Sequence, residues 1–205
     1  MEKSMSKERK IRFLALVMAC FMIFQLAPAL AEEEESLPWA KTTASVQATN
    51  HSVYNIMVNN GIAYAKLISL GPELKKKTSL LVAAIDNSQI QVNQDGEKRV
   101  ARMKTILPNA LFGSCAKTIT FGNHVSVFKA SAFAGTNVEK LKFKSVIKLS
   151  LSTNAFLGYT RAKLAKIKLT FNVKAYSTEA EQEAFVNKLT ARGFKKANIS
   201  FKSFQ

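Results

Sequence analysis

The sequence predicts a mainly β chain with some helix, in which short parallel strands stack into an α/β solenoid between an N-terminal β cap and a C-terminal helical cap. One pattern occurs three times, at residues 106–113, 128–135 and 151–158, with spacings of 22 and then 23 residues. A period of this size is typical of solenoids. An alternating apolar pair follows each copy and predicts a short strand with one buried face. The pairs are Ile119 and Phe121, Leu141 and Phe143, and Ile167 and Leu169.

The clear repeats run from 106 to 175. Residues 46–105 before them predict an N-terminal cap and one degenerate coil, and residues 176–205 after them predict a C-terminal helical cap. In residues 46–105, Asn59-Asn60-Gly61 separates two apolar runs and predicts a β-hairpin, although a helix remains the competing interpretation of either arm. Residues 79–85 fit either a strand or a buried helix. In residues 176–205, the capping box from Thr178 to Glu181 predicts a helix start and Gly193 its end. A short strand at 197–201 is expected to close the domain.

The first 31 residues have the three regions of a secretory signal peptide. A basic opening precedes an uninterrupted apolar run at residues 13–24, and Ala29-Leu30-Ala31 supplies small residues for cleavage. The apolar run is shorter than the roughly 20 residues that a membrane-spanning helix needs. We therefore expect export with cleavage after Ala31 and no transmembrane span afterwards. A lipid anchor at Cys20 is the less favoured alternative.

Charge is unevenly distributed along the 205 residues. The full chain has a formal charge of +16, which becomes +13 when residues 1–31 are removed. Residues 32–45 predict an acidic and polar linker that begins with four glutamates. Residues 98–174 instead contain fifteen Lys or Arg and one acid, Glu139. A field of this sign attracts polyanions, whatever the fold.

Two of the three copies resemble the BspA-type leucine-rich repeat of bacterial surface proteins. In that repeat an apolar residue lies four positions before an Ala-Phe pair, and a small residue follows; the corresponding residues here are Ala132, Phe133 and Gly135, then Ala155, Phe156 and Gly158. The resemblance covers residues 100–170 and extends weakly to about residue 50. It implies a right-handed leucine-rich solenoid on an exported protein, with adhesion or ligand binding as the usual role. The first copy departs from the pattern because its phenylalanine, Phe112, is shifted by one place, and residues 159–163 are an insertion in the third.

Few residues after the predicted cleavage site could support catalysis. Only two histidines are present, and the sequence has no nucleophile elbow, phosphate-binding loop, dinucleotide fingerprint or metal-spaced cluster. His124 is predicted to be a solvated turn residue. Cys115, the one remaining cysteine, is predicted to be buried and inert, with a disulfide between chains left open. We expect no enzymatic activity, no cofactor, no metal and no small-molecule substrate.

A row of lysines is the strongest functional signal. If Ile119, Leu141 and Ile167 are equivalent inward residues, the outer face carries two rows: Thr118, Lys140 and Lys166, and beside them Thr120, Lys142 and Lys168. Lysines on strands about 4.8 Å apart repel each other, and a bound polyanion would relieve the repulsion. The alternative is a solvated face in which lysine only prevents edge pairing between sheets.

The sequence thus predicts a secreted or cell-surface bacterial protein that presents a basic strand face to an anionic polymer, an acidic glycan or an acidic protein surface. Nucleic acid is disfavoured because few aromatic residues lie among the lysines to stack on bases. A structural spacer or assembly protein of the cell surface is the second hypothesis, and a hydrolase with an unrecognised site is the third.

Overall fold

The fold was analysed in a computed structural model, which describes residues 45–48, 50–59, 62–83, 85–86 and 100–204. All of these residues lie in the same unit of the chain. The predicted signal peptide, residues 1–31, lies outside the described residues, as does the predicted linker up to residue 44.

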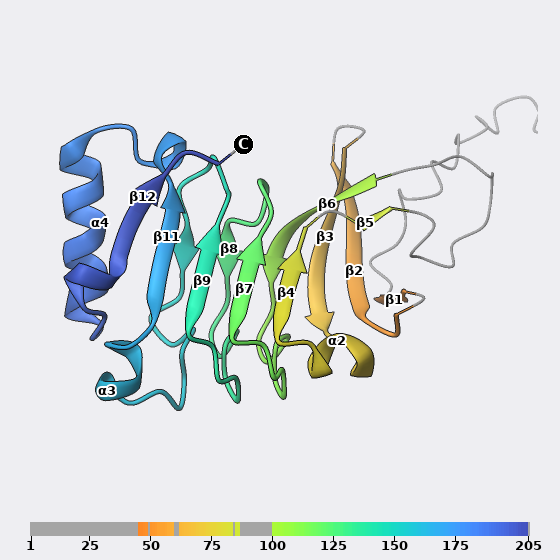
Figure 1. The fold of residues 1–205 in the computed structure, drawn as a ribbon. Helices are drawn as coiled ribbons and strands as arrows, with labels where there is room; N and C mark the ends of the chain where they lie inside the picture. The colour runs from red at the N-terminus through yellow and green to blue at the C-terminus, as the bar shows by residue number, and fades with distance from the viewer. Residues whose placement is uncertain (1–44, 49, 60–61, 84, 87–99, 205) are drawn as a thin grey trace, which may run out of the picture. The chain divides into compact units, whose positions relative to one another are not determined.

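The strands form two sheets, and from β6 to β11 the chain passes alternately from one sheet to the other (Figure 1). The five-stranded sheet has the order β12-β11-β9-β7-β4, and all of its neighbouring strands are parallel. Its strands are β4 (Ser79–Val82), β7 (Thr118–Phe121), β9 (Lys140–Phe143), β11 (Lys168–Asn172) and β12 (Ile199–Lys202).

The seven-stranded sheet has the order β1-β2-β3-β6-β8-β10, with β5 paired to β6. Its strands are β1 (Ser45–Gln47), β2 (Val53–Asn59), β3 (Ile62–Ser69), β5 (Ile85–Asp86), β6 (Val100–Ile106), β8 (Val127–Phe128) and β10 (Ser150–Leu151). Pairing is parallel from β3 through β10 and antiparallel in β1-β2-β3 and β5-β6. The fold is therefore a mixed α/β fold with parallel-strand sheets and few helices. This much of the predicted fold class is confirmed.

Equivalent residues of the first two repeats lie side by side. In the five-stranded sheet Ile119 pairs with Leu141 and Phe121 with Phe143. The third repeat was predicted with the wrong register, because Leu169, not Ile167, lies beside Leu141. The insertion forms helix α3 (Arg161–Leu164), so 28 residues separate Leu141 from Leu169 where 22 separate Ile119 from Leu141. The strand therefore starts two residues later than expected.

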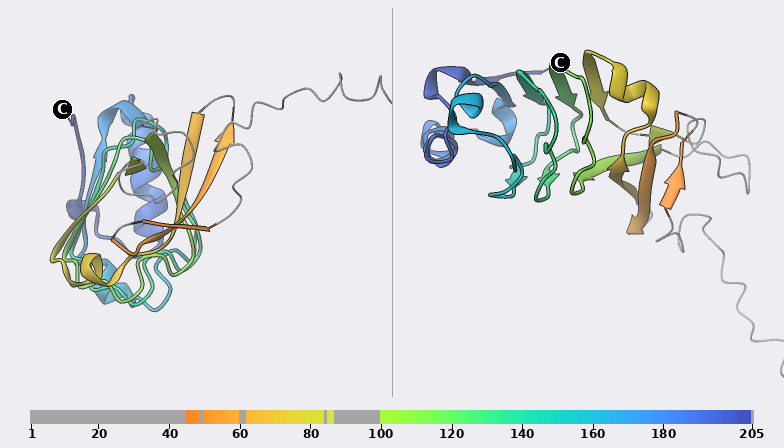
Figure 2. Two further views of the ribbon diagram at one scale, coloured as in Figure 1. Left: turned by 90° about the vertical axis from the view of Figure 1, so that its right-hand side faces the viewer. Right: turned by 90° about the horizontal axis from the view of Figure 1, so that it is seen from below.

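The two sheets face each other (Figure 2), and aromatic rings fill the space between them. The ring of Phe121 stacks on that of Phe143 with centroids 5.3 Å apart, and Phe143 stacks on Phe171 at 4.9 Å. Phe128 reaches Phe121 from the opposite sheet at 4.8 Å, edge to face. These four residues are at most 2% exposed. Burial of such large rings supplies much of the hydrophobic stabilisation.

The repeated Ala-Phe-x-Gly segments form the turns between the sheets. Ala132 and Ala155 are fully buried, and the rings of Phe133 and Phe156 stack 4.4 Å apart. Each copy ends in a glycine with positive φ, namely Gly113, Gly135 and Gly158. This is a conformation that glycine adopts without steric cost.

The first copy keeps this turn despite its shifted phenylalanine. Leu111 occupies the inner place and is fully buried, while Phe112 points outward and is 56% exposed. Its ring lies against Gly135, where an added Cβ would come within 2.5 Å of it. Glycine at this position therefore makes room for the ring.

The N-terminal part confirms the predicted hairpin. Strands β2 and β3 are antiparallel, with Asn59 paired to Ile62. Residues 79–85, left open between strand and helix, contain β4 and the start of β5. Between β3 and β4 lies the short helix α2 (Pro72–Lys76). Residues 87–99 lie outside the described residues.

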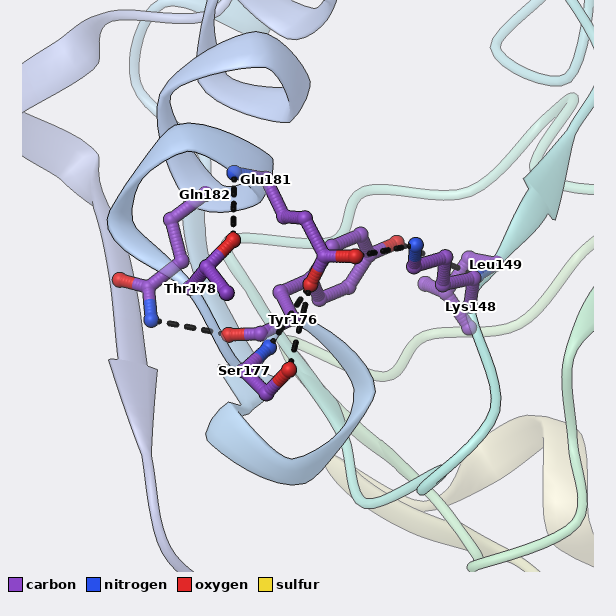
Figure 3. Close-up of polar contacts among 7 residues, drawn as sticks. All are labelled: Lys148, Leu149, Tyr176, Ser177, Thr178, Glu181 and Gln182. Carbon is purple, nitrogen blue, oxygen red and sulfur yellow. Dashed lines mark hydrogen bonds and ion pairs between the residues drawn. The ribbon is translucent and has the colours of Figure 1, made fainter.

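The C-terminal cap agrees with its prediction. Helix α4 (Glu179–Ala191) starts at Thr178, whose hydroxyl accepts a hydrogen bond from the Glu181 backbone N–H at 3.2 Å (Figure 3). The Glu181 carboxylate accepts one from the Ser177 N–H at 3.0 Å and pairs with Lys148 at 2.6 Å. The apolar face of α4 is buried, Gly193 follows with φ +108°, and β12 supplies the expected closing strand.

A tyrosine joins this cap to the loop that precedes β10. The hydroxyl of Tyr176 accepts a hydrogen bond from the Leu149 backbone N–H at 3.1 Å (Figure 3). Burial raises the pKa of Tyr176 to about 12, despite the opposing effect of this hydrogen bond. The phenol is therefore neutral at physiological pH, and it satisfies a backbone donor that would otherwise lack a partner.

Arg192 closes the edge of the seven-stranded sheet. Strand β10 is the last strand of that sheet within the described part of the chain. The Arg192 guanidinium donates hydrogen bonds to the carbonyl of Leu151 at 3.1 Å and to that of Ser152 at 3.2 Å. Arg192 thus satisfies carbonyl groups that a further strand would otherwise bind.

We expect Arg192→Met to lower the free energy of unfolding by about 2 kcal/mol, because it removes charge-assisted hydrogen bonds and leaves edge carbonyls unpaired. Urea denaturation followed by circular dichroism measures the change. Lys188→Met removes a positive charge from an exposed site on the same helix and should change stability by less than about 0.5 kcal/mol. Equal losses in the two variants would show that the hydrogen bonds of Arg192 do not stabilise the cap.

Candidate anion-binding face

The outer side of the five-stranded sheet carries a row of polar and basic side chains, which we call the strand face. Side chains alternate along each strand, so that β9 buries Leu141 and Phe143 and exposes Lys140 and Lys142. β4 and β7 alternate in the same way. The residues of the strand face are Ser79, Leu81, Thr118, Thr120, Lys140, Lys142, Lys168 and Thr170.

The structure brings five of the six predicted site residues onto this face. Thr118 lies beside Lys140, and Thr120 lies beside Lys142. On the other side of β9, Lys140 pairs with Lys168. The predicted like-charge pair therefore exists, although its second member is Lys168.

Lys166 does not belong to the strand face, and its predicted position over Lys140 is wrong. It precedes β11, and its backbone N–H donates to the carbonyl of Lys163 at the end of α3, at 3.2 Å. The added helix shifts the strand by two residues and leaves Lys166 outside it. Lys166 instead lines a separate hollow of about 180 Å³ with Lys117 and Glu139.

The one acid near these lysines is already paired. Glu139 forms an ion pair of 2.8 Å with Lys117. The hydrogen bond from Lys117, with its positive charge, lowers the pKa of Glu139 below its usual value. Among the described residues, no carboxylate pairs with Lys140, Lys142 or Lys168. Their positive charges are therefore free to act on a ligand.

The strand face is hollowed at its β4 end. A groove of about 580 Å³ lies there between α2, the ends of β4, β7 and β9, and the C-terminal tail. The amine of Lys144 lies 5.8 Å from the ring centroid of Phe204. The residues that line the groove include Lys77, Leu81, Thr120, Lys142, Lys144 and Phe204.

Sequence reasoning missed several of these groove residues. Lys144 continues the alternation of Lys140 and Lys142, so the same pattern, extended by two residues, identifies it. The sequence gives no sign that Phe204 lies near β9, because that contact depends on the path of the chain after β12.

His124 lines a second hollow of about 290 Å³, which shares Leu81 and Lys144 with the groove. Its side chain is half-buried, where the sequence predicted a solvated residue. Burial, and to a lesser degree the charge of Arg102, lowers the pKa of His124. The imidazole is therefore neutral at pH 7.

Cys115 is exposed, and the prediction of a buried residue is wrong. Its neighbours Ser114 and Ala116 point inward and are buried, so the alternation of the chain directs Cys115 outward. The thiol is free in this chain.

The described residues contain neither a metal-binding cluster nor a membrane-spanning helix. No group of three or more His, Cys, Asp or Glu side chains there could hold a metal ion. In the same part of the chain, no helix has the length and apolar character needed to cross a bilayer.

Comparison with known proteins found no matching family model, no matching curated protein and no matching solved structure.

Proposed function

We propose that this protein is an exported, non-enzymatic binding or adhesion module whose strand face takes an anionic partner. The observation that carries the proposal is the gathering of Lys140, Lys142 and Lys168 on one side of one sheet, with Lys144 directly after the end of β9. None of the four has a carboxylate partner among the described residues. The partner is an acidic polymer of the cell wall, an acidic glycan or an acidic protein surface.

The pairing of the lysines gives a physical reason for anion binding. Lys140 and Lys168 lie directly beside each other on parallel strands, where like charges repel. An anion placed between the two amines converts this repulsion into attraction. Because the amines are exposed, the attraction depends on ionic strength.

The fold supports assignment to a short BspA-type leucine-rich-repeat solenoid. From β6 to β11 strands alternate between two sheets, within which they pair in parallel, equivalent residues of β7 and β9 pair in register, and the Ala-Phe-x-Gly segments form equivalent turns. In such repeats the surface of stacked strands is a common binding surface. The location, a bacterial surface or the medium around it, is inferred from residues 1–31.

A spacer that stacks end to end is less well supported. Arg192 already binds the edge carbonyl of β10, and α4 packs at that end of the described chain. A stacking partner would have to displace this contact. The binding role therefore explains more of the structure.

Replacing the three lysines of the strand face and the adjoining Lys144 by glutamine tests the proposal. The variant K140Q/K142Q/K144Q/K168Q should elute from immobilised heparin, used here as a model sulfated glycan, at a salt concentration roughly half that of the unchanged protein. The side chains are at or near the surface, so the fold should persist; circular dichroism checks this.

A matched variant separates position from net charge. K66Q/K104Q/K129Q/K188Q removes the same four charges from the seven-stranded sheet, the segment after β8, and α4. It should elute close to the unchanged protein. If the two quadruple variants elute at the same salt concentration, attraction is a property of the whole surface and the proposed site is wrong.

A further inference from the structure

Among the described residues, β4 is an edge strand whose outward backbone groups have no partner strand. Within the described part of the chain it is the last strand of the five-stranded sheet. The carbonyls of Thr78 and Val82 accept hydrogen bonds from Lys117 and Gly122, on the side of β7. Backbone groups of successive residues point to opposite edges of a strand, so those of Ser79 and Leu81 point away from β7. This edge can accept another strand.

The outer side of this edge is basic with an apolar centre. Leu81 is 68% exposed on the strand face, although it is a large apolar residue. Lys77, Lys142 and Lys144 line the same groove, and in the described residues none of them pairs with a carboxylate. A ligand side chain that binds on this side should be acidic, because its carboxylate can pair with the amines of these lysines.

The inner side of the same edge is lined mainly by apolar residues, although Asn50 and Lys77 also line it. A hollow of about 380 Å³ runs beside Leu80 and Val82, the two buried residues of β4. Apolar side chains from the seven-stranded sheet and the segment after β3 supply much of its opposite wall: Tyr54, Leu67, Leu70 and Met103. A side chain that packs among these apolar residues is best apolar, because a buried polar group without a partner costs free energy.

We propose that the edge of β4 binds an extended acidic peptide segment of a partner protein by strand addition. The inference rests on the proposed function and deepens it, since it names the class of partner taken at the β4 end of the strand face. The segment pairs its backbone with Ser79 and Leu81. Its side chains alternate, with acidic residues toward the basic groove and apolar residues toward the inner hollow.

Strand addition explains features that simple charge attraction leaves unexplained. Main-chain hydrogen bonds give affinity, and the pockets for alternate side chains give specificity. A strand has a side-chain period of two, which matches a basic groove on one side of β4 and an apolar hollow on the other. A polysaccharide has no use for the exposed Leu81 or for the free backbone groups.

The test measures binding of fluorescent peptides to the full chain by anisotropy. The probe is an acetylated and amidated peptide of alternating glutamate and valine. A peptide of alternating glutamate and serine has the same charge and should bind at least roughly tenfold more weakly, because the inner hollow is left unfilled. Equal binding of the two peptides would overturn the proposal.

Backbone methylation tests the pairing itself. Two further glutamate-valine peptides carry N-methyl groups on every second residue, one on the glutamates and one on the valines. In an added strand, the backbone N–H groups of either the glutamates or the valines face β4, but not both. One methylated peptide should therefore bind roughly tenfold or more weakly, and the other should lose much less affinity. If neither methylated peptide binds more weakly than the unmethylated one, no strand is added.

A variant of the chain separates this inference from the proposed function. Leu81→Gln should weaken peptide binding and leave elution from heparin unchanged. Leu157→Gln changes another exposed leucine, which lies in a distant turn, and should affect neither. Peptide binding that is unchanged in Leu81→Gln would contradict the inference alone, whereas equal heparin elution of the two quadruple lysine variants contradicts the proposed function.

Discussion

Replacing Phe121 by alanine is expected to lower the free energy of unfolding by about 4 kcal/mol. Phe121 is fully buried, and its ring contacts those of Phe128, Phe133 and Phe143. Removing it leaves a cavity between the two sheets, at a place where rings from several repeats meet. Urea denaturation followed by far-ultraviolet circular dichroism gives the change in the free energy of unfolding.

The control for this variant is Phe112→Ala. Phe112 belongs to the same repeat region and loses the same atoms, but it is 56% exposed. Its replacement should cost about 1 kcal/mol or less. If Phe121→Ala were no more destabilising than Phe112→Ala, the rings between the sheets would not form a close-packed core.

Replacing Gly71 by alanine should also be severely destabilising, by about 3 kcal/mol. A Cβ at this position would lie 1.8 Å from the carbonyl oxygen of Asn50, and the backbone of His51 is also within 3 Å. The Gly71 N–H donates to the Ser52 hydroxyl at 2.8 Å, so the two segments cannot separate without losing that bond. Thermal unfolding should show the loss as a lower midpoint.

Gly158→Ala distinguishes this crowding from a backbone effect. Gly71 has φ −68°, which alanine adopts readily, so its cost comes only from the close approach. Gly158 has φ +85° and no atom within 4 Å of an added Cβ, so its cost is the conformational one, about 1 kcal/mol. If Gly71→Ala lowers the stability no more than Gly158→Ala does, the turn at Asn50 does not pack against Gly71.

The repeat pattern was sufficient to predict the strands wherever the spacing stays constant. Ile119 and Leu141 pair as expected because the 22 residues that separate them equal the spacing of the first two copies of the pattern. The prediction failed at Ile167, where the insertion forms a helix. An insertion changes the number of residues between strands, and an apolar alternation that continues through Ile167, Leu169 and Phe171 does not reveal which pair enters the sheet.

The candidate site could likewise be predicted where it depends on alternation along a strand, and not where it depends on contacts distant in sequence. Alternation along β9 placed Lys140 and Lys142 outward, as the structure has them. Features that depend on contacts distant in sequence were missed: the groove beside Leu81, the approach of Phe204 to Lys144, and the edge of β4. The prediction that Cys115 is buried is wrong because Cys115 lies between Ser114 and Ala116, which both point inward and leave it outward.

The most direct test of the anion-binding face is the reactivity of individual lysines. The protein is acetylated briefly with and without heparin, and mass spectrometry gives the rate at each lysine. We expect heparin to slow the reaction at Lys140, Lys142 and Lys168 and to leave Lys104, Lys129 and Lys188 unchanged, because only the first three lie on the strand face. Equal protection of both groups, or protection of the second group alone, would contradict the account.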